Sequence, residues 1–239
     1  MIAAVRSIVT YAAISLYVLL IGAPAVLLSI VIRRPGFLYP LGEIGVRLGL
    51  FLSGIRYTVT GDQHIRPTPA SVYAVNHASN VEPPILFLAL RRLFPRLRVL
   101  YKSELRKLPI LTSAFDVAGF IPVERGNRDQ SLPAIERAAE ALRAGNSFLI
   151  FPEGTRSRTG SLLPFKKGGF VMALKAQAPV VPVAIKGARA AMRKGSPWIQ
   201  PVTIHVSFGE PIPTTGLTLD DRETLVTAVR GEVERLLNA

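Results

Sequence analysis

The beginning of the chain is dominated by apolar side chains. The stretch from Ser7 to Ile32 carries no charged residue. As one helix rising about 1.5 Å per residue, it is longer than the ~30 Å hydrocarbon core of a bilayer. Pro24 predicts a kink or a break in that helix. A second apolar segment, Tyr39 to Ile55, contains Glu43 and Arg47. These two charges make a second span a poor fit, and they favour an interfacial helix that folds back onto the membrane.

The charges that flank the first apolar segment predict its orientation. Arg6 precedes it, while Arg33 and Arg34 follow it. The larger positive count on the C-terminal side places the body of the protein in the cytoplasm. The alternative is a cleaved signal peptide, because Ala23-Pro24-Ala25 offers small residues in a cleavage-like pattern. The apolar run continues past that point, which favours an anchor.

From residue 56 onward, short apolar runs alternate with amphipathic ones. Strands are predicted at 71–76, 99–102, 119–123, 147–151, 180–185 and 202–208, and helices at 83–94, 132–144, 165–177 and 220–237. Alternation of this kind predicts an α/β fold with a mixed, largely parallel sheet flanked by helices. We therefore expect an N-terminal membrane-anchoring helical segment of one or two helices over residues 1–55 and one folded domain over residues 56–239.

The charge balance narrows the class of partner. The chain has 29 Lys and Arg against 16 Asp and Glu, a net charge of +13, and a mean hydropathy of +0.34. Basicity combined with high hydropathy favours an anionic membrane surface and lipid phosphate. The basic runs lack the aromatic interleaving of a nucleic-acid platform, so no nucleic acid is expected. The absence of cysteine excludes disulfides, thiolate metal sites and a cysteine nucleophile. His64 and His205 are isolated, so no metal site is expected.

One histidine lies where an α/β sheet usually places its chemistry. His77 follows a predicted strand, and two prolines open a helix shortly after it. Glu82 lies directly before Pro83, which disfavours the α region for Glu82 and lets its carboxylate fold back toward the imidazole. A carboxylate on one ring nitrogen fixes the tautomer and produces a general base. Taken alone, a His and a Glu at this spacing are more often a surface histidine in a turn with a capping carboxylate.

A second polar segment follows the predicted strand at 147–151. Gly154 permits a sharp turn there. Thr155 and Arg156 then present a hydroxyl and a guanidinium to an anion, and the planar guanidinium of arginine is well suited to binding phosphate. Lys102 and Arg125 each follow an apolar run and are expected to line the same cleft. Glu153 is expected to orient Arg125 or to close the loop by hydrogen bonding.

Together these segments resemble the glycerolipid acyltransferases, the family of the bacterial 1-acylglycerol-3-phosphate acyltransferases. Asn76-His77-x4-Glu82 is similar to the family's first motif, with Glu in place of the usual Asp. Four further blocks follow in the family's order: Lys102-Ser103-Glu104-Leu105 with Pro109, Gly119-Phe120-Ile121-Pro122-Val123-Glu124-Arg125, Phe151-Pro152-Glu153-Gly154-Thr155-Arg156-Ser157 and Val181-Pro182-Val183-Ala184-Ile185. The resemblance covers roughly residues 77–185.

The resemblance implies an O-acyltransferase with residues 56–239 as its catalytic domain. His77, partnered by Glu82, would take the proton from the sn-2 hydroxyl of 1-acylglycerol-3-phosphate (lysophosphatidic acid), which then attacks an acyl thioester of CoA or acyl carrier protein and gives phosphatidic acid. Acceptor phosphate would be bound by Lys102, Arg125 and Arg156, with Glu153, Gly154 and Thr155 shaping the same subsite. The resemblance implies no cofactor and places the protein in the inner membrane, with the catalytic domain facing the cytoplasm.

Several alternatives remain open at this point. No Gly-x-Ser-x-Gly elbow occurs, so direct transfer is expected, with Ser79 as a turn or cap residue. The acceptor is alternatively another lysolipid, glycerol-3-phosphate or a lipid without phosphate. A further alternative is that the chain is not an enzyme but a catalytically silent membrane protein that binds lipids. Glu82, which stands where the family usually has Asp, favours this alternative.

Overall fold

The computed structural model describes residues 2–124 and 128–239. A seven-stranded sheet forms its centre, in the order β1-β7-β6-β2-β5-β3-β4. Only the pair of β6 (Val180–Lys186) and β7 (Thr203–Phe208) is antiparallel. The other strands are β1 (Arg56–Thr60), β2 (Val72–Val75), β3 (Leu97–Lys102), β4 (Ile121–Val123) and β5 (Ser147–Ile150), and all their pairings are parallel. The predicted mixed, largely parallel α/β fold is confirmed.

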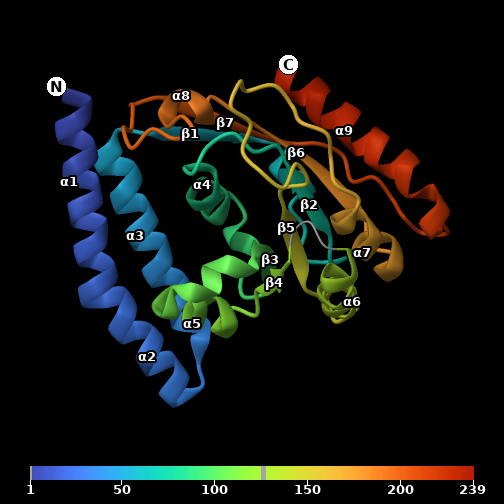
Figure 1. The fold of residues 1–239 in the computed structure, drawn as a ribbon, viewed down its shortest axis with the longest axis horizontal. Coiled ribbons are helices and arrows are strands. Elements are labelled where there is room, and N and C mark those ends of the chain that lie inside the picture. Colours follow the sequence, from blue (N-terminus) through green and yellow to red (C-terminus); the bar gives the residue numbers. More distant parts are fainter. Residues whose placement is uncertain (1, 125–127) are drawn as a thin grey trace.

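The sheet is buried on both faces, as the apolar character of its strands requires. In β2, Val72 and Ala74 join one core, while Tyr73 and Val75 join the other. On the first face lie α6 (Arg128–Arg143), α7 (Gly168–Ala176) and α9 (Arg222–Asn238). On the opposite face lies α4 (Glu82–Ala89). Figure 1 shows these two layers on either side of the sheet.

The N-terminal helices form a further layer outside α4. The chain runs through α1 (Ile2–Tyr17), a π-helical turn at Val18–Gly22, α2 (Ala23–Ile32) and α3 (Leu38–Ser53), and α1 packs against α3. Figure 1 shows these helices along one side of the molecule. Of the described residues, one continuous helix, Ile2–Ile32, is long and apolar enough to cross a membrane.

Pro24 does not break the first helix. The predicted interruption takes the form of the π-helical turn just before it, in which the Ala23 amide donates to the Val18 carbonyl five residues earlier. A local shift of this kind absorbs the hydrogen bond that proline cannot make.

Other element boundaries differ from the sequence prediction in part. The helix predicted over 83–94 already includes Glu82 and ends at Ala89, with a 3-10 turn at Arg91–Leu93. One strand and two α-helices of the described residues were not predicted, namely β1, α5 (Pro109–Val117) and the short α8 (Ala188–Ala191). The carboxyl ends of β2, β5 and β3 lie side by side at one edge of the sheet, because these strands are parallel neighbours. Residue 77 and residues 151–157 follow the ends of β2 and β5, and Lys102 is the last residue of β3.

Candidate active site

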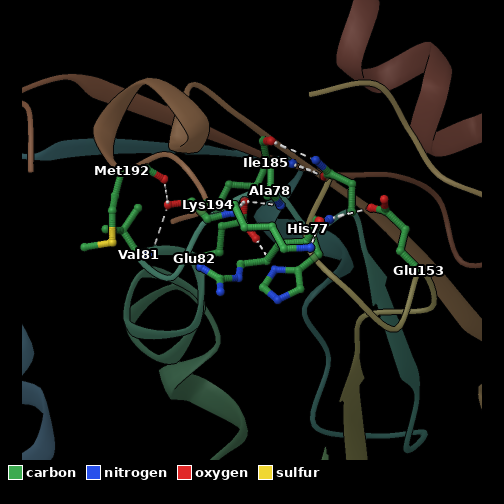
Figure 2. A network of polar contacts seen from close by, with 11 residues as sticks. His77, Ala78, Val81, Glu82, Glu153, Ile185, Met192 and Lys194 are labelled. Atoms are coloured by element: carbon green, nitrogen blue, oxygen red, sulfur yellow. Dashed lines mark hydrogen bonds and ion pairs between the residues drawn. The ribbon is translucent and has the colours of Figure 1, made fainter. Parts of the chain in front are cut away.

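The corner after β2 is held in place by a buried asparagine. The Asn76 side chain donates through Nδ2 to the Ile185 carbonyl at 3.1 Å, and its Oδ1 accepts from the Ile185 amide at 2.7 Å. Both bonds join the end of β2 to its neighbour β6, and Asn76 is buried. The direction in which the chain leaves the sheet is therefore fixed just before His77 (Figure 2).

The structure brings His77 and Glu82 together. His77 Nδ1 lies 2.6 Å from Glu82 Oε2, and Glu82 Oε1 accepts from the amides of Ala78 and Ser79, each at 2.9 Å. The Glu82 side chain is 0% exposed and that of His77 is 17% exposed. Glu82 is the first residue of α4 and not the residue before it, so it also lies at the positive end of the helix dipole.

These contacts determine which ring nitrogen is available for chemistry. Burial raises the pKa of the Glu82 carboxyl, while the hydrogen bonds from His77 and from the Ala78 and Ser79 amides act to lower it. The two amide donors on one carboxylate oxygen favour a carboxylate that also accepts from Nδ1. Nδ1 then carries the proton, and Nε2 presents its lone pair on the partly exposed side of the ring. The longer side chain of Glu fits this corner and makes all three contacts.

The segment after β5 supports His77 from the other side. The Phe151 ring stacks on the imidazole with centroids 4.2 Å apart. Glu153, which is buried, accepts from the His77 amide at 2.6 Å through Oε1 and from the Leu163 amide at 3.0 Å through Oε2. The Ser157 amide donates to the His77 carbonyl at 2.7 Å. Glu153 thus closes the loop by hydrogen bonding, which was one of the two expected roles. Burial raises the pKa of its carboxyl.

The turn at Gly154 has the backbone conformation that its sequence predicts. Its φ is +69°, and a Cβ at this position would meet the Lys166 side chain at 2.8 Å. After the turn, the Thr155 hydroxyl and the Arg156 carbonyl both accept from Lys194 Nζ, at 3.0 and 2.9 Å. The backbone angle therefore favours glycine here, whereas the end of the flexible Lys166 side chain could move away from a Cβ.

The remaining predicted cations are not joined to this turn. Lys102 pairs with Glu104 at 2.5 Å, and in the described part of the chain no hydrogen bond or ion pair links Lys102 to Thr155 or Arg156. Arg125 lies outside the described residues.

Sequence reasoning missed two side chains at this site. Lys194 lies 39 residues from Thr155 in a loop, and one lysine in so basic a chain carries no local signal. Phe151 was expected to end a strand and to begin the motif over residues 151–157, and no role was expected for its ring. Ser79 is a turn residue, as expected: it is fully buried and its hydroxyl donates to the Met192 carbonyl at 2.7 Å.

Two cavities border the corner. One, of about 870 Å³, is apolar and lies among the N-terminal helices, α4 and α5, and it reaches Asn80 and Val81 next to Glu82. The other, of about 700 Å³, includes Phe151, Gly154 and Lys166 in its walls. Among the described residues no cluster of three or more His, Cys, Asp or Glu could hold a metal ion.

Comparison with known proteins identifies the family of this chain. Residues 56–186 match the family model described as Acyltransferase. The 1-acyl-sn-glycerol-3-phosphate acyltransferase of Limnanthes douglasii is 34% identical over 86% of this chain and 71% of its own length. The protein of the same name from Borreliella burgdorferi is 28% identical over 80% of this chain and 76% of its own.

A solved structure shows the same fold. The crystal structure of the 1-acyl-sn-glycerophosphate (LPA) acyltransferase PlsC from Thermotoga maritima superposes with a TM-score of 0.83 at 22% identity, covering 99% of this chain and 96% of that one. The chain belongs to the acyltransferase family, because the family model matches more than half of its length and the Limnanthes douglasii relative is 34% identical over 86% of it.

Proposed function

We propose that the chain transfers a fatty acyl group from an acyl thioester of CoA or acyl carrier protein to the sn-2 hydroxyl of 1-acylglycerol-3-phosphate, giving phosphatidic acid. The observation that carries this proposal is the buried Glu82 carboxylate on His77 Nδ1, which leaves Nε2 free to accept a proton. The names of the relatives support the choice of acceptor.

The reaction follows from the orientation of the His77 ring, whose Nδ1 faces Glu82. His77 Nε2 takes the proton of the acceptor hydroxyl as its oxygen attacks the thioester carbonyl carbon. The C–S bond then breaks, the thiolate leaves, and Nε2 returns the proton to sulfur. Glu82 holds the imidazole in the competent tautomer and balances its transient positive charge. The thioester supplies the acyl group already activated, so no cofactor is required.

The turn after β5 is the proposed site of the acceptor phosphate. Arg156 offers a planar donor fork for phosphate, and Gly154 and Thr155 shape the turn that carries it. We also assign phosphate binding to Lys102 and Arg125. Lys102 would exchange its ion pair with Glu104 for the substrate, since both side chains are about half exposed and such a surface pair is weak.

We further propose that residues 1–55 anchor the protein and residues 56–239 form the catalytic domain. Large apolar side chains of the N-terminal helices face outward, and Val31 and Phe51 are 79% and 81% exposed. These helices also wall the apolar cavity beside the corner, so a lipid acceptor would enter from the bilayer. The positive flank of Arg33 and Arg34 favours the inner membrane with the catalytic domain in the cytoplasm.

The test is acyl transfer by the purified protein in phospholipid vesicles. Radiolabelled acyl-CoA or acyl carrier protein is offered with 1-acylglycerol-3-phosphate, other lysolipids, glycerol-3-phosphate and a lipid alcohol without phosphate. We expect labelled phosphatidic acid, and we expect none from the folded variant His77→Ala. Transfer only to an uncharged acceptor, or near-normal turnover by His77→Ala, would contradict the proposal.

A further inference from the structure

The segment between α8 and β7 contacts both parts of the candidate site. This linking segment, residues 192–199, begins with Met192, whose carbonyl accepts from the Ser79 hydroxyl at 2.7 Å. Ser79 lies in the corner that holds His77 and is 0% exposed. The start of the linking segment is therefore fixed against the corner after β2.

Two residues later, Lys194 reaches the turn after β5. Its ammonium donates to the Thr155 hydroxyl at 3.0 Å and to the Arg156 carbonyl at 2.9 Å. Figure 2 shows Lys194 extending over the corner that holds His77 and Glu82. Among the described residues no carboxylate forms an ion pair with Lys194, so its charge serves the turn alone. Lys194 therefore holds the turn at a side chain and at the backbone.

The far end of the linking segment is bound to the first N-terminal helix. The Tyr11 hydroxyl donates to the Pro197 carbonyl at 2.7 Å. The Ile199 amide donates to Ser7 Oγ at 2.8 Å, and Ser7 is 0% exposed. These contacts join α1 to a segment that lies more than 180 residues away in the sequence.

We propose that the linking segment couples the N-terminal helices to the active site and that Lys194 is its positioning residue. The segment is short and is hydrogen-bonded at both ends, so a displacement of α1 moves the Lys194 backbone. Lys194 then moves the Thr155–Arg156 turn relative to His77. Seating of the helices in a membrane would thus set the turn in the position where it receives the acceptor phosphate. This inference rests on the proposed function.

The first experiment isolates Lys194. Lys194→Met keeps the length of the side chain and removes its donors, and Arg193→Met is the matched control because it removes the same charge from the adjacent, exposed position. We expect Lys194→Met to raise KM for 1-acylglycerol-3-phosphate by about tenfold or more, with KM for acyl-CoA and the melting temperature unchanged. Lys194→Arg should restore part of the loss, and Arg193→Met should behave as wild type. Equal effects of the two Met variants would overturn the positioning role in favour of general charge.

The second experiment tests the coupling to α1. Tyr11→Phe removes only the hydroxyl that reaches Pro197. Thr10→Val is its control, because within the described residues the Thr10 hydroxyl bonds to the Arg6 carbonyl of its own helix and to nothing else. In vesicles, Tyr11→Phe should lower kcat/KM for the lysolipid roughly two- to tenfold, with flotation unchanged, and Thr10→Val should not. The combined Tyr11→Phe and Lys194→Met variant should lose less than the product of the two single losses.

The outcomes separate this inference from the proposed function. Independent, multiplicative losses in the combined variant, or an unchanged Tyr11→Phe, would overturn the coupling while the enzyme stays active. A folded wild-type protein without transfer to 1-acylglycerol-3-phosphate would overturn both.

Discussion

Replacing Glu82 by Gln removes one charge from the candidate site and leaves its shape. Glu82 Oε1 accepts from the Ala78 and Ser79 amides, so the glutamine oxygen must take that position. Its NH₂ group then faces His77 Nδ1, which lies 2.6 Å from the present Oε2. Nδ1 is forced to accept, the ring proton moves to Nε2, and the imidazole can no longer act as the base.

The size of the loss follows from the loss of general-base catalysis. We expect kcat for acyl transfer to fall by about 10²- to 10⁴-fold, with KM for both substrates nearly unchanged because Glu82 is buried away from substrate. Glu82→Asp is the matched control, since it keeps a carboxylate. It should retain at least about tenfold more activity than Glu82→Gln, because only a carboxylate fixes the competent tautomer. The assay is initial-rate transfer of labelled acyl groups in vesicles.

The same substitution also changes how the stability of the folded protein depends on pH. Burial raises the pKa of Glu82 in the folded protein above its ordinary value of 4.5, so the folded state holds the proton more tightly than the unfolded state. Stability from this group is present at low pH and is lost as pH rises through the folded pKa. The melting temperature of Glu82→Gln relative to wild type should therefore increase as the pH rises above 4.5, the ordinary pKa of this group. A Glu82→Gln enzyme within threefold of wild-type kcat, or a relative melting temperature that falls with pH, would refute this reasoning.

Three further substitutions test other parts of the structure. Gly154→Ala forces a side chain into φ +69° and against Lys166. The free energy of unfolding, measured by chemical denaturation, should fall by about 1–2 kcal/mol, and the rate of acyl transfer should fall as well. An unchanged denaturation midpoint would contradict the need for glycine in this turn. Asn76→Ala leaves the amide and carbonyl of Ile185 without their partner and should lower the free energy of unfolding by about 2–4 kcal/mol. A loss below about 0.5 kcal/mol would show that the two hydrogen bonds of the Asn76 side chain are not needed. Phe51→Asp places a charge on an 81% exposed apolar position and should reduce vesicle flotation by about tenfold or more without changing the melting temperature in detergent; unchanged flotation would exclude this face from the bilayer contact.

Much of the fold was predictable because its signals are local. The apolar runs of β2, β5 and β6 and the amphipathic helices α6 and α9 have the periodicity of their elements, and the structure has them within a few residues of the predicted bounds. β1 was missed although its residues alternate in polarity and burial, which is the pattern of a strand. The segment is short, and its pairing with β7 brings together residues far apart in the sequence.

The candidate site likewise has features that the sequence predicted and features that only the tertiary structure decided. Residue type and spacing in the sequence determined the His77–Glu82 pair and the glycine turn, since each depends on neighbours a few residues away. Anion binding by the loop after β5 stays a prediction. Only the tertiary structure decided that Glu153 holds the His77 backbone, that Phe151 stacks on the imidazole and that Lys194 holds the turn. The physical reason is that hydrogen bonds between residues tens of positions apart depend on which strands are neighbours, and strand order is fixed by packing of the whole sheet and not by any local pattern.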